Sequence, residues 1–265
     1  MSPPHLELEH LTSPEVRAAL EAGFSTVIVP CGAVEQHGPH LPLFVDAEHG
    51  TRLGLEVAQR LGHALMAPTI RVGISEHHMR FPGTVSLRPE TFAAVCRDYA
   101  VSLARHGFEH VCFLPTHGGN FRPLAEMVED LNAAVGDRCT VIAYTDMIEM
   151  ITTWRRAVQA EGGDPERVGG HADIAESSLV ALMHPHLVRH DKVSGGYRPA
   201  LEENVMLRII REGFDTVSPN GVLGDARGLS KAIGRRCLSD VADVVTAYFA
   251  RVRITAAGEP GSVHE

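Results

Sequence analysis

Apolar and polar residues follow two patterns along the chain. Short apolar runs rich in β-branched residues are typical of buried parallel strands, and they fall at residues 25–31, 65–70, 110–115 and 140–144. Longer stretches carry apolar residues at three- and four-residue spacing, the period of a helix that covers a sheet. These stretches are residues 47–61, 89–106 and 120–135. The alternation predicts an α/β fold with a mostly parallel central sheet and helices on both faces.

Nothing in the sequence indicates a second domain. The chain contains no internal repeat, no low-complexity tract and no Pro/Ser-rich linker. We therefore expect a single domain over residues 1–257. Residues 258–265, which contain Gly, Glu, Pro and Ser, are expected to form a disordered tail.

Composition narrows the class of protein. A net charge of −9 argues against nucleic acid as a partner, and no run approaches the roughly 20 apolar residues that span a bilayer. We expect neither nucleic acid nor membrane as a partner. The cysteines are odd in number, form no CxxC pair and follow no secretory leader, which predicts free core thiols in a cytoplasmic protein. They are Cys31, Cys96, Cys112, Cys139 and Cys237.

The sixteen histidines are the unusual feature, since average usage would give about six to eight. Ligands of open α/β sheets bind beyond the carboxyl ends of the strands, so chemistry is expected in the loops after the predicted strands. The segment GAVEQHGPHLPLFVD (residues 32–46) follows the first of them. Glu35 and His37 would project to the same face of an extended segment, with Asp46 returning from the following turn. Alone, this pattern is more often a solvated loop.

Imidazole and carboxylate ligands together suit Zn²⁺ or Mn²⁺ better than Ca²⁺, and one carboxylate can bridge two cations. The segment PTHGGN (residues 115–120) would direct His117 into the same crevice. Gly118 and Gly119 allow close approach of a ligand, and Asn120 can cap the next helix. A capping turn with an incidental histidine is an equally good interpretation of this segment alone.

A third segment, GGHADIAESS (residues 169–178), places Glu176 five residues after His171. If a helix begins near Ala172, both side chains can reach one cavity. Asp173 is better explained as a first-turn acid favoured by the helix dipole than as a catalytic group.

The loop GISEHHMRFPGT (residues 73–84) follows the second predicted strand and could wall the same pocket. His77 and His78 are adjacent, so we expect their side chains to diverge rather than bind one ion together. We expect His78 to point inward. Aromatic residues that could cover a flat substrate are more simply explained as packing residues; they are Phe44, Phe81 and Trp154.

Four motifs occur in order along nearly the whole chain: EQHGPHLPL followed by Asp46, then HxxFPGT, HGGN and HAxxxES. Together they resemble the creatininase family of amidohydrolases, and four ordered motifs are far more specific than any one. The segment NGVLGD (residues 220–225) is similar to a glycine-rich loop of that family. The resemblance implies a creatininase-like fold and a homo-oligomer, a hexamer assembled from dimers.

The resemblance also implies a site with two divalent ions, Zn²⁺ and/or Mn²⁺. One would be held by Glu35, Asp46 and His117, and the other by His37, Asp46 and Glu176, with Asp46 bridging. Two ions lower the pKa of a shared water and polarise an amide carbonyl, and His171 would protonate the departing nitrogen. The substrate pocket would be formed by His78, Gly118, Gly119 and Asn120.

Departures from the family pattern limit which substrate the resemblance implies. Creatininase proper has an acidic residue where this chain has Gly119, which puts creatinine in doubt. Members with the HGGN form include a peptidase of redox-peptide maturation, a formamide deformylase and a keto-inositol hydrolase. The usual HAGxxETS reads HADIAESS here, with Asp173 for glycine and Ser177 for threonine.

We therefore predict a hydrolase that opens a C–N bond of a small-molecule amide, cyclic amides included, with the other family substrates as alternatives. A non-catalytic metal- or ligand-binding protein is a further alternative, although the glycine-rich loops leave room for water and substrate. No GxGxxG follows the first strand and no GxSxG is present, which argues against a dinucleotide oxidoreductase and a serine hydrolase.

Overall fold

A sheet of four parallel strands forms the centre of the computed structural model, which describes residues 3–199 and 202–256. The strand order is β2-β1-β3-β4. The bounds are Thr26–Cys31 for β1, Ala64–Met66 for β2, His110–Pro115 for β3 and Thr140–Ala143 for β4. The two central strands pair in register from Thr26 opposite His110 to Cys31 opposite Pro115. The strands occur in the four predicted regions.

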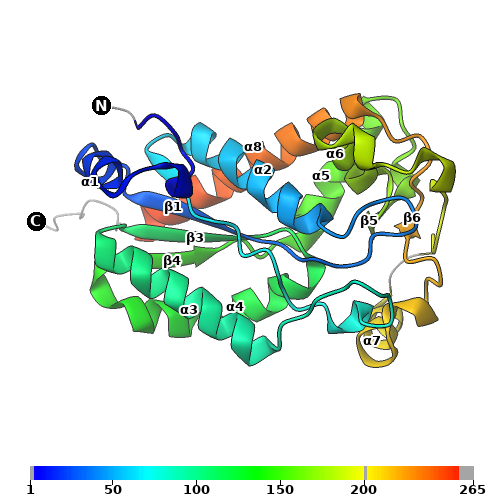
Figure 1. Ribbon diagram of the computed structural model, residues 1–265, viewed down its shortest axis with the longest axis horizontal. Helices are drawn as coiled ribbons and strands as arrows, with labels where there is room; N and C mark the ends of the chain where they lie inside the picture. The colour runs from blue at the N-terminus through cyan, green and yellow to red at the C-terminus, as the bar shows by residue number, and fades with distance from the viewer. Residues whose placement is uncertain (1–2, 200–201, 257–265) are drawn as a thin grey trace, which may run out of the picture.

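Helices cover both faces of this sheet, as predicted (Figure 1). Because side chains alternate along a strand, Ile28 and Cys112 face one core, while Val27 and Val111 face the other. The first core contains residues of α2 (Val45–Leu61), α5 (Met147–Ala160), α6 (Ile174–Met183) and α8 (Lys231–Ala256). The second contains residues of α1 (Ser13–Glu21), α3 (Pro89–His106) and α4 (Gly118–Val135).

Local signals explain several helix ends. The side chains of Thr12 and Glu15 form a capping box at the start of α1. Helix α3 starts with Pro89, which has no N–H to leave unpaired, and ends at Gly107, whose φ of 104° lies in the left-handed region. Both ends of α3 lie where the periodicity of the sequence predicts them, whereas α1 was not predicted.

Several further elements lie beyond the carboxyl ends of the strands (Figure 1). An antiparallel pair is formed by β5 (Val168–His171) and β6 (Leu223–Gly224), and helix α7 (Glu203–Glu212) packs against the short helix η2 (Glu76–His78). The other 3₁₀ helices are η1 (Leu8–His10), η3 (Gly136–Arg138), η4 (Pro165–Arg167), η5 (Pro185–Leu187), η6 (His190–Lys192) and η7 (Phe214–Thr216). The sequence did not predict β5, β6 or α7.

Several predicted boundaries were wrong. The second strand stops at Met66 instead of residue 70, because Pro68 cannot donate to the ladder, and Ile70 returns only for one bridge to Cys31. Helix α2 begins at Val45, so Asp46 lies in its first turn instead of the preceding loop. Helix α4 begins at Gly118, and α6 begins only at Ile174.

All five cysteines are buried and free, which confirms the prediction of core thiols. In the part of the chain that the structure describes, no helix is long and apolar enough to cross a membrane. The expected tail, residues 258–265, lies outside the described residues.

Candidate metal centre

Five buried side chains from four segments converge beyond the carboxyl ends of β1 and β3. The loop after β1 carries Glu35 and His37, the first turn of α2 carries Asp46, and the residue before α4 is His117. Glu176 comes from α6. Ligand atoms of Glu35, Asp46 and His117 lie within 4.8 Å of one another, and so do those of His37, Asp46 and Glu176. The structure thus brings together the two trios that the family resemblance implied.

Asp46 belongs to both trios and directs a different carboxylate oxygen toward the histidine of each. Its Oδ1 lies 3.2 Å from His37 Nε2, and its Oδ2 lies 3.2 Å from His117 Nδ1. On the outer sides, Glu35 Oε1 is 3.3 Å from His117 Nδ1, and Glu176 Oε2 is 3.6 Å from His37 Nε2. This arrangement is suited to a carboxylate that bridges two cations.

The carboxylates of the two trios carry negative charge that bound cations could neutralise. Both carboxylate oxygens of Glu35 and Oδ2 of Asp46 are buried without a hydrogen-bond partner among the described residues. Within residues 3–199 and 202–256, no lysine or arginine forms an ion pair with Glu35, Asp46 or Glu176. Burying carboxylates without such compensation is costly. The three side chains therefore fit divalent cations.

Hydrogen bonds orient the two histidines of the trios so that each can bind a cation. His37 donates from Nδ1 to the Glu35 carbonyl oxygen at 3.1 Å, and His117 donates from Nε2 to the Ile74 carbonyl oxygen at 2.9 Å. Each bond fixes the tautomer and leaves the other ring nitrogen facing the carboxylates. Both rings thus present an unprotonated nitrogen when a cation is bound.

Protons and cations compete for this site. Burial opposes protonation of His37, but Asp46, Glu176 and Glu35 outweigh it and raise its pKa to about 10. The pKa of His117 is also raised well above its usual value by Glu35 and Asp46, again against burial. Burial raises the pKa of Glu176 to about 8. Because cations must displace these protons, metal affinity should increase with pH.

Gln36 connects two further histidines beside the trios. Its Nε2 lies 2.9 Å from His78 Nδ1, 2.9 Å from His171 Nε2 and 3.2 Å from the Gly221 carbonyl oxygen, and its Oε1 accepts from the Gly38 amide. Donation to His78 and Gly221 uses both amide hydrogens. His78 Nε2 then carries the ring proton and faces Glu35 Oε1 at 3.3 Å. His78 is buried and points inward, as predicted.

His171 is fixed by the same network. Its Nε2 lies 2.9 Å from the backbone carbonyl oxygen of Gln36, which can only accept. Donation from Nε2 leaves Nδ1 unprotonated and directed toward Glu35 Oε1 at 3.7 Å. Burial, together with nearby His37, lowers the pKa of His171 well below its usual value. His171 is thus a neutral imidazole with a free nitrogen at the centre.

Comparisons with known proteins show the family of this chain. The family model Creatininase, described as creatinine amidohydrolase, matches residues 9–249. The chain belongs to the creatininase family. It is 31% identical over 240 residues to a mycofactocin precursor peptide peptidase of Mycobacterium ulcerans (strain Agy99), covering 88% of this chain and 87% of the relative. It is 30% identical over 196 residues to creatinine amidohydrolase of Pseudomonas putida, covering 69% and 74%.

The fold agrees as well. The solved structure "Creatininase Mn" superposes with a TM-score of 0.76 at 25% identity, covering 92% of this chain and 99% of that structure. The chain therefore has the creatininase fold over nearly its whole length.

His77 corrects one expectation within this family site. Its ring centroid lies 4.4 Å from that of His78 and 5.7 Å from that of His117, with which it stacks. Ring nitrogens of His77 and His78 both come within 4.8 Å of a Glu35 oxygen. The expected divergence was wrong, because these residues lie in a 3₁₀ turn, where successive side chains are rotated by about 120° instead of alternating.

Asn120 does not cap the helix that contains it. Its amide donates to the carbonyl oxygens of Cys31 and Gly32 and accepts from the Ile74 N–H, at 3.0–3.1 Å. The bonds go to the last residue of β1, to the loop after β1 and to the loop after β2. Asn120 therefore holds those loops against α4, and its contact with substrate stays a prediction.

Gly119 occupies the position where creatininase proper has an acidic residue, and the structure shows why a side chain is excluded here. A Cβ at this position would lie 2.2 Å from the Ile74 carbonyl oxygen and 2.5 Å from His117 Nε2. At Gly118, by contrast, the nearest atom that a Cβ would meet is Met147 Sδ at 3.8 Å. The loop around Ile74 thus approaches α4 at the place where the acid would extend.

We expect Gly119→Ala to lower the free energy of unfolding by about 1–3 kcal/mol, because the methyl group must displace Ile74 or His117. Gly118→Ala is the matched control and should be neutral or slightly stabilising, since alanine is the better helix former by up to about 1 kcal/mol. Urea unfolding of both metal-free variants measures the difference. Equal stabilities would contradict the close approach of this loop to α4.

Asp173 caps α6. One carboxylate oxygen accepts from the amides of Ala175 and Glu176, and the other accepts from Gly169 and Gly170. These four bonds support the structural interpretation of Asp173. The capped helix starts two residues later than expected, and His171 is the last residue of β5.

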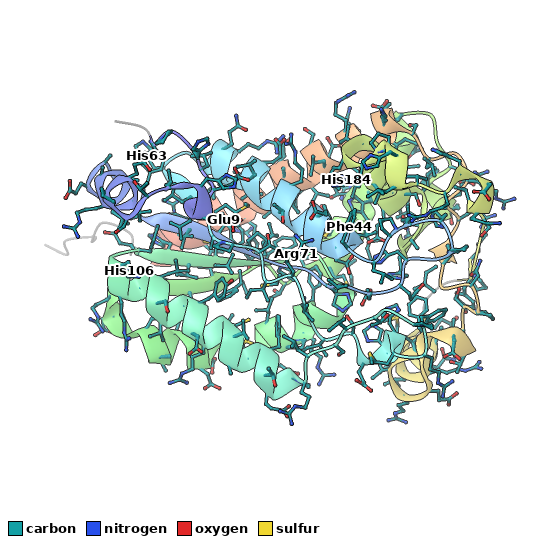
Figure 2. The ribbon with its side chains drawn as sticks, in the orientation of Figure 1. Glu9, Phe44, His63, Arg71, His106 and His184 are labelled. Atoms are coloured by element: carbon teal, nitrogen blue, oxygen red, sulfur yellow. The ribbon has the colours of Figure 1, made fainter. Side chains whose placement is uncertain are left out.

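Phe214 is a site residue that the sequence did not reveal. Its ring centroid lies 4.3 Å from that of His78 and 4.9 Å from that of His171, and the residue is buried. It lies in η7, in a region without a recognisable motif, so no local signal marked it. Of the aromatic residues that the sequence offered as substrate covers, Trp154 is buried in the core, and Phe44 packs edge-on against His184 (Figure 2).

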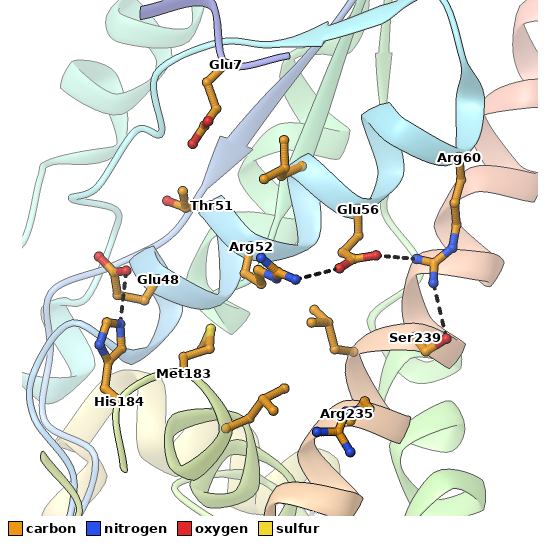
Figure 3. Close-up of a pocket in the computed structure, with 13 residues that line it drawn as sticks. Glu7, Glu48, Thr51, Arg52, Glu56, Arg60, Met183, His184, Arg235 and Ser239 are labelled. Atoms are coloured by element: carbon orange, nitrogen blue, oxygen red, sulfur yellow. Dashed lines mark hydrogen bonds and ion pairs between the residues drawn. The ribbon is translucent and has the colours of Figure 1, made fainter. Parts of the chain in front are cut away.

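A groove of about 660 Å³ lies elsewhere, between α2, α6 and α8 (Figure 3). None of the five ligand residues lines it. Several of its charged side chains are paired with each other, as in Arg52–Glu56 at 2.9 Å and His184–Glu48 at 3.4 Å. The unpartnered buried carboxylates lie at the metal centre, so we place the chemistry there.

Proposed function

We propose that this member of the creatininase family is a metal-dependent hydrolase that cleaves an amide C–N bond of a short peptide. The observation that carries the proposal is the pair of buried trios that share Asp46, with both Glu35 oxygens unpartnered. In this proposal Glu35, Asp46 and His117 hold one divalent cation, and His37, Asp46 and Glu176 hold the other.

The cations would be Zn²⁺ and/or Mn²⁺, which the mixed imidazole and carboxylate donors suit. The name of the solved structure "Creatininase Mn" includes manganese, which supports this choice. When bound, the two cations would lower the pKa of a water molecule and polarise the scissile carbonyl group.

His171 would transfer a proton from the attacking water to the departing nitrogen. Its free Nδ1 faces the centre, so it can accept a proton from the attacking water and pass it to the departing nitrogen. An amine expelled as an anion is a very poor leaving group, so it needs a proton from a nearby acid, and the lowered pKa of His171 favours giving that proton up. The hydrogen bond from Nε2 to Gln36 holds the ring in position, and Phe214 packs against it and limits access of bulk water.

Two observations favour a peptide over creatinine. The peptidase relative covers more of the chain than the creatinine amidohydrolase relative does. Gly119 also leaves the centre without the acid expected of creatininase proper, and the Ile74 loop fills the space. Creatinine remains the second candidate, because the Pseudomonas putida relative is still 30% identical.

The test is a substrate panel with Zn²⁺- or Mn²⁺-loaded protein: short peptides, creatinine and N-formyl compounds, with products identified by mass spectrometry. Release of an amino acid or a short peptide fragment, abolished by a chelator and restored by metal, is the expected result. Turnover of creatinine alone would replace the peptide by the second candidate. Full metal loading without any hydrolysis would indicate a binding protein instead of an enzyme.

A further inference from the structure

His40 and Ser177 form a buried pair that the proposed reaction does not use. His40 Nε2 lies 2.8 Å from Ser177 Oγ, and both residues have no exposed surface. Burial, together with nearby His37, lowers the pKa of His40 to about 4, so the ring carries one proton near neutral pH. The pair joins two segments that lie 137 residues apart in the sequence.

These segments carry two of the ligands of one trio. His40 lies in the loop that also holds His37, and Ser177 is adjacent to Glu176 on α6. The other trio, formed by Glu35, Asp46 and His117, has no member on α6. A bond between this loop and α6 therefore sets the distance between His37 and Glu176. Glu35 of the other trio lies in the same loop as His37, so the selectivity comes from the α6 end of the bond, which among the five ligands carries Glu176 alone.

The serine hydroxyl also lies beside the turn that holds the Glu176 carboxylate. Ser177 Oγ is 3.5 Å from the Ala172 carbonyl oxygen, and the Ala172 amide donates to Glu176 Oε2. Ala172 has a φ of 51°, in the left-handed region that a residue with a side chain rarely adopts. Such a turn persists only where its surroundings hold it. With His40 donating to Ser177 Oγ, the serine proton is available for the Ala172 carbonyl.

We propose that His40 and Ser177 are positioning residues that fix Glu176 against His37 and so set the cation affinity of that trio alone. This inference rests on the proposed metal centre. Removing the hydroxyl would leave the Glu35 trio unchanged and would widen or loosen the Glu176 trio. The chain would then change from binding two cations tightly to binding one tightly and one weakly.

The experiment is a calorimetric titration of metal-free full-length Ser177→Ala with Mn²⁺, with thermal melting as a check of folding. We expect one site of wild-type affinity and one site weakened about 10- to 100-fold, the range for residues that support metal ligands. Ser177→Thr keeps the hydroxyl and should restore the second site. His40→Gln should reproduce the selective loss by a change on the other segment.

Ser178→Ala is the matched control, because the Ser178 hydroxyl is also buried but accepts from the Ser230 amide instead. It should bind two cations like the wild type. Equal weakening of both sites in Ser177→Ala, or wild-type affinity at both, would overturn the positioning role while leaving the metal centre in place. A wild-type protein that binds no Mn²⁺ and no Zn²⁺ would instead overturn the proposed function, and this inference with it.

Discussion

Asp46→Asn should abolish tight binding of both cations and lower turnover by about 10³-fold or more. Asparagine has nearly the same shape, but its side chain ends in one carbonyl oxygen and one NH2 group. It therefore cannot direct equivalent oxygens toward His37 and His117. Two cations contribute several kcal/mol to stabilising the transition state of hydrolysis, and each 1.36 kcal/mol corresponds to a factor of ten in rate. Elemental analysis of the purified variant and its kcat for the peptide substrate measure the two effects.

Glu48→Gln is the control for this variant. Glu48 lies on the same helix but pairs with Arg71 and His184, away from the trios. It should keep both cations and its activity, because these partly exposed ion pairs contribute little. If Asp46→Asn retained two cations per chain, or if it lost them and still hydrolysed substrate at the wild-type rate, the shared-carboxylate site would be refuted.

The sequence predicted the fold where local patterns decide it. The strands at Thr26–Cys31 and His110–Pro115 and the helix Pro89–His106 were found within one residue of their bounds, because apolar runs, the proline and the glycine are all local signals. The second strand was overestimated, since periodicity alone does not show where a strand leaves the edge of a sheet. The β5–β6 pair joins segments more than 50 residues apart and leaves no periodic pattern.

For the site, too, the sequence predicted some features and missed others. Glu35, His37, Asp46, His117 and Glu176 could be named because the family resemblance supplied the grouping that one sequence cannot. Gln36 was inside a recognised motif, yet its role depends on the tautomers of His78 and His171, which only the packed structure defines. Phe214 reaches the same histidines from a segment without a motif. Long-range contacts of this kind have no local pattern in the sequence.

The two trios differ in how they are supported. The ligands of the first are held mainly through the backbone of neighbouring loops, as in the bond from His117 to Ile74 and the Asn120 bonds to Cys31 and Gly32. Glu176 depends instead on the turn at Ala172 and the contact of α6 with the His40 loop. Substitutions on α6 should therefore affect one cation, and substitutions around Gly119 the other.

His171→Ala should retain both cations but lower kcat for an ordinary peptide about 10²- to 10⁴-fold, the contribution of a positioned general acid and base. Metal content should not change, because His171 belongs to neither of the two trios that share Asp46. The variant should lose much less activity toward a p-nitrophenyl ester of the same peptide, because the p-nitrophenolate leaving group departs as an anion without a proton. His184→Gln, a partly exposed histidine in the groove between α2, α6 and α8, should match the wild type.

This comparison separates proton transfer from a general effect on the site. A variant that is slow on both substrates has lost something other than the acid, such as the position of Glu35, which His171 Nδ1 approaches at 3.7 Å. A variant with full kcat on the ordinary peptide removes His171 from the mechanism. Selective rescue by the better leaving group would place the proton of the departing amine on His171 Nδ1, the one ring nitrogen that the bond to Gln36 leaves free.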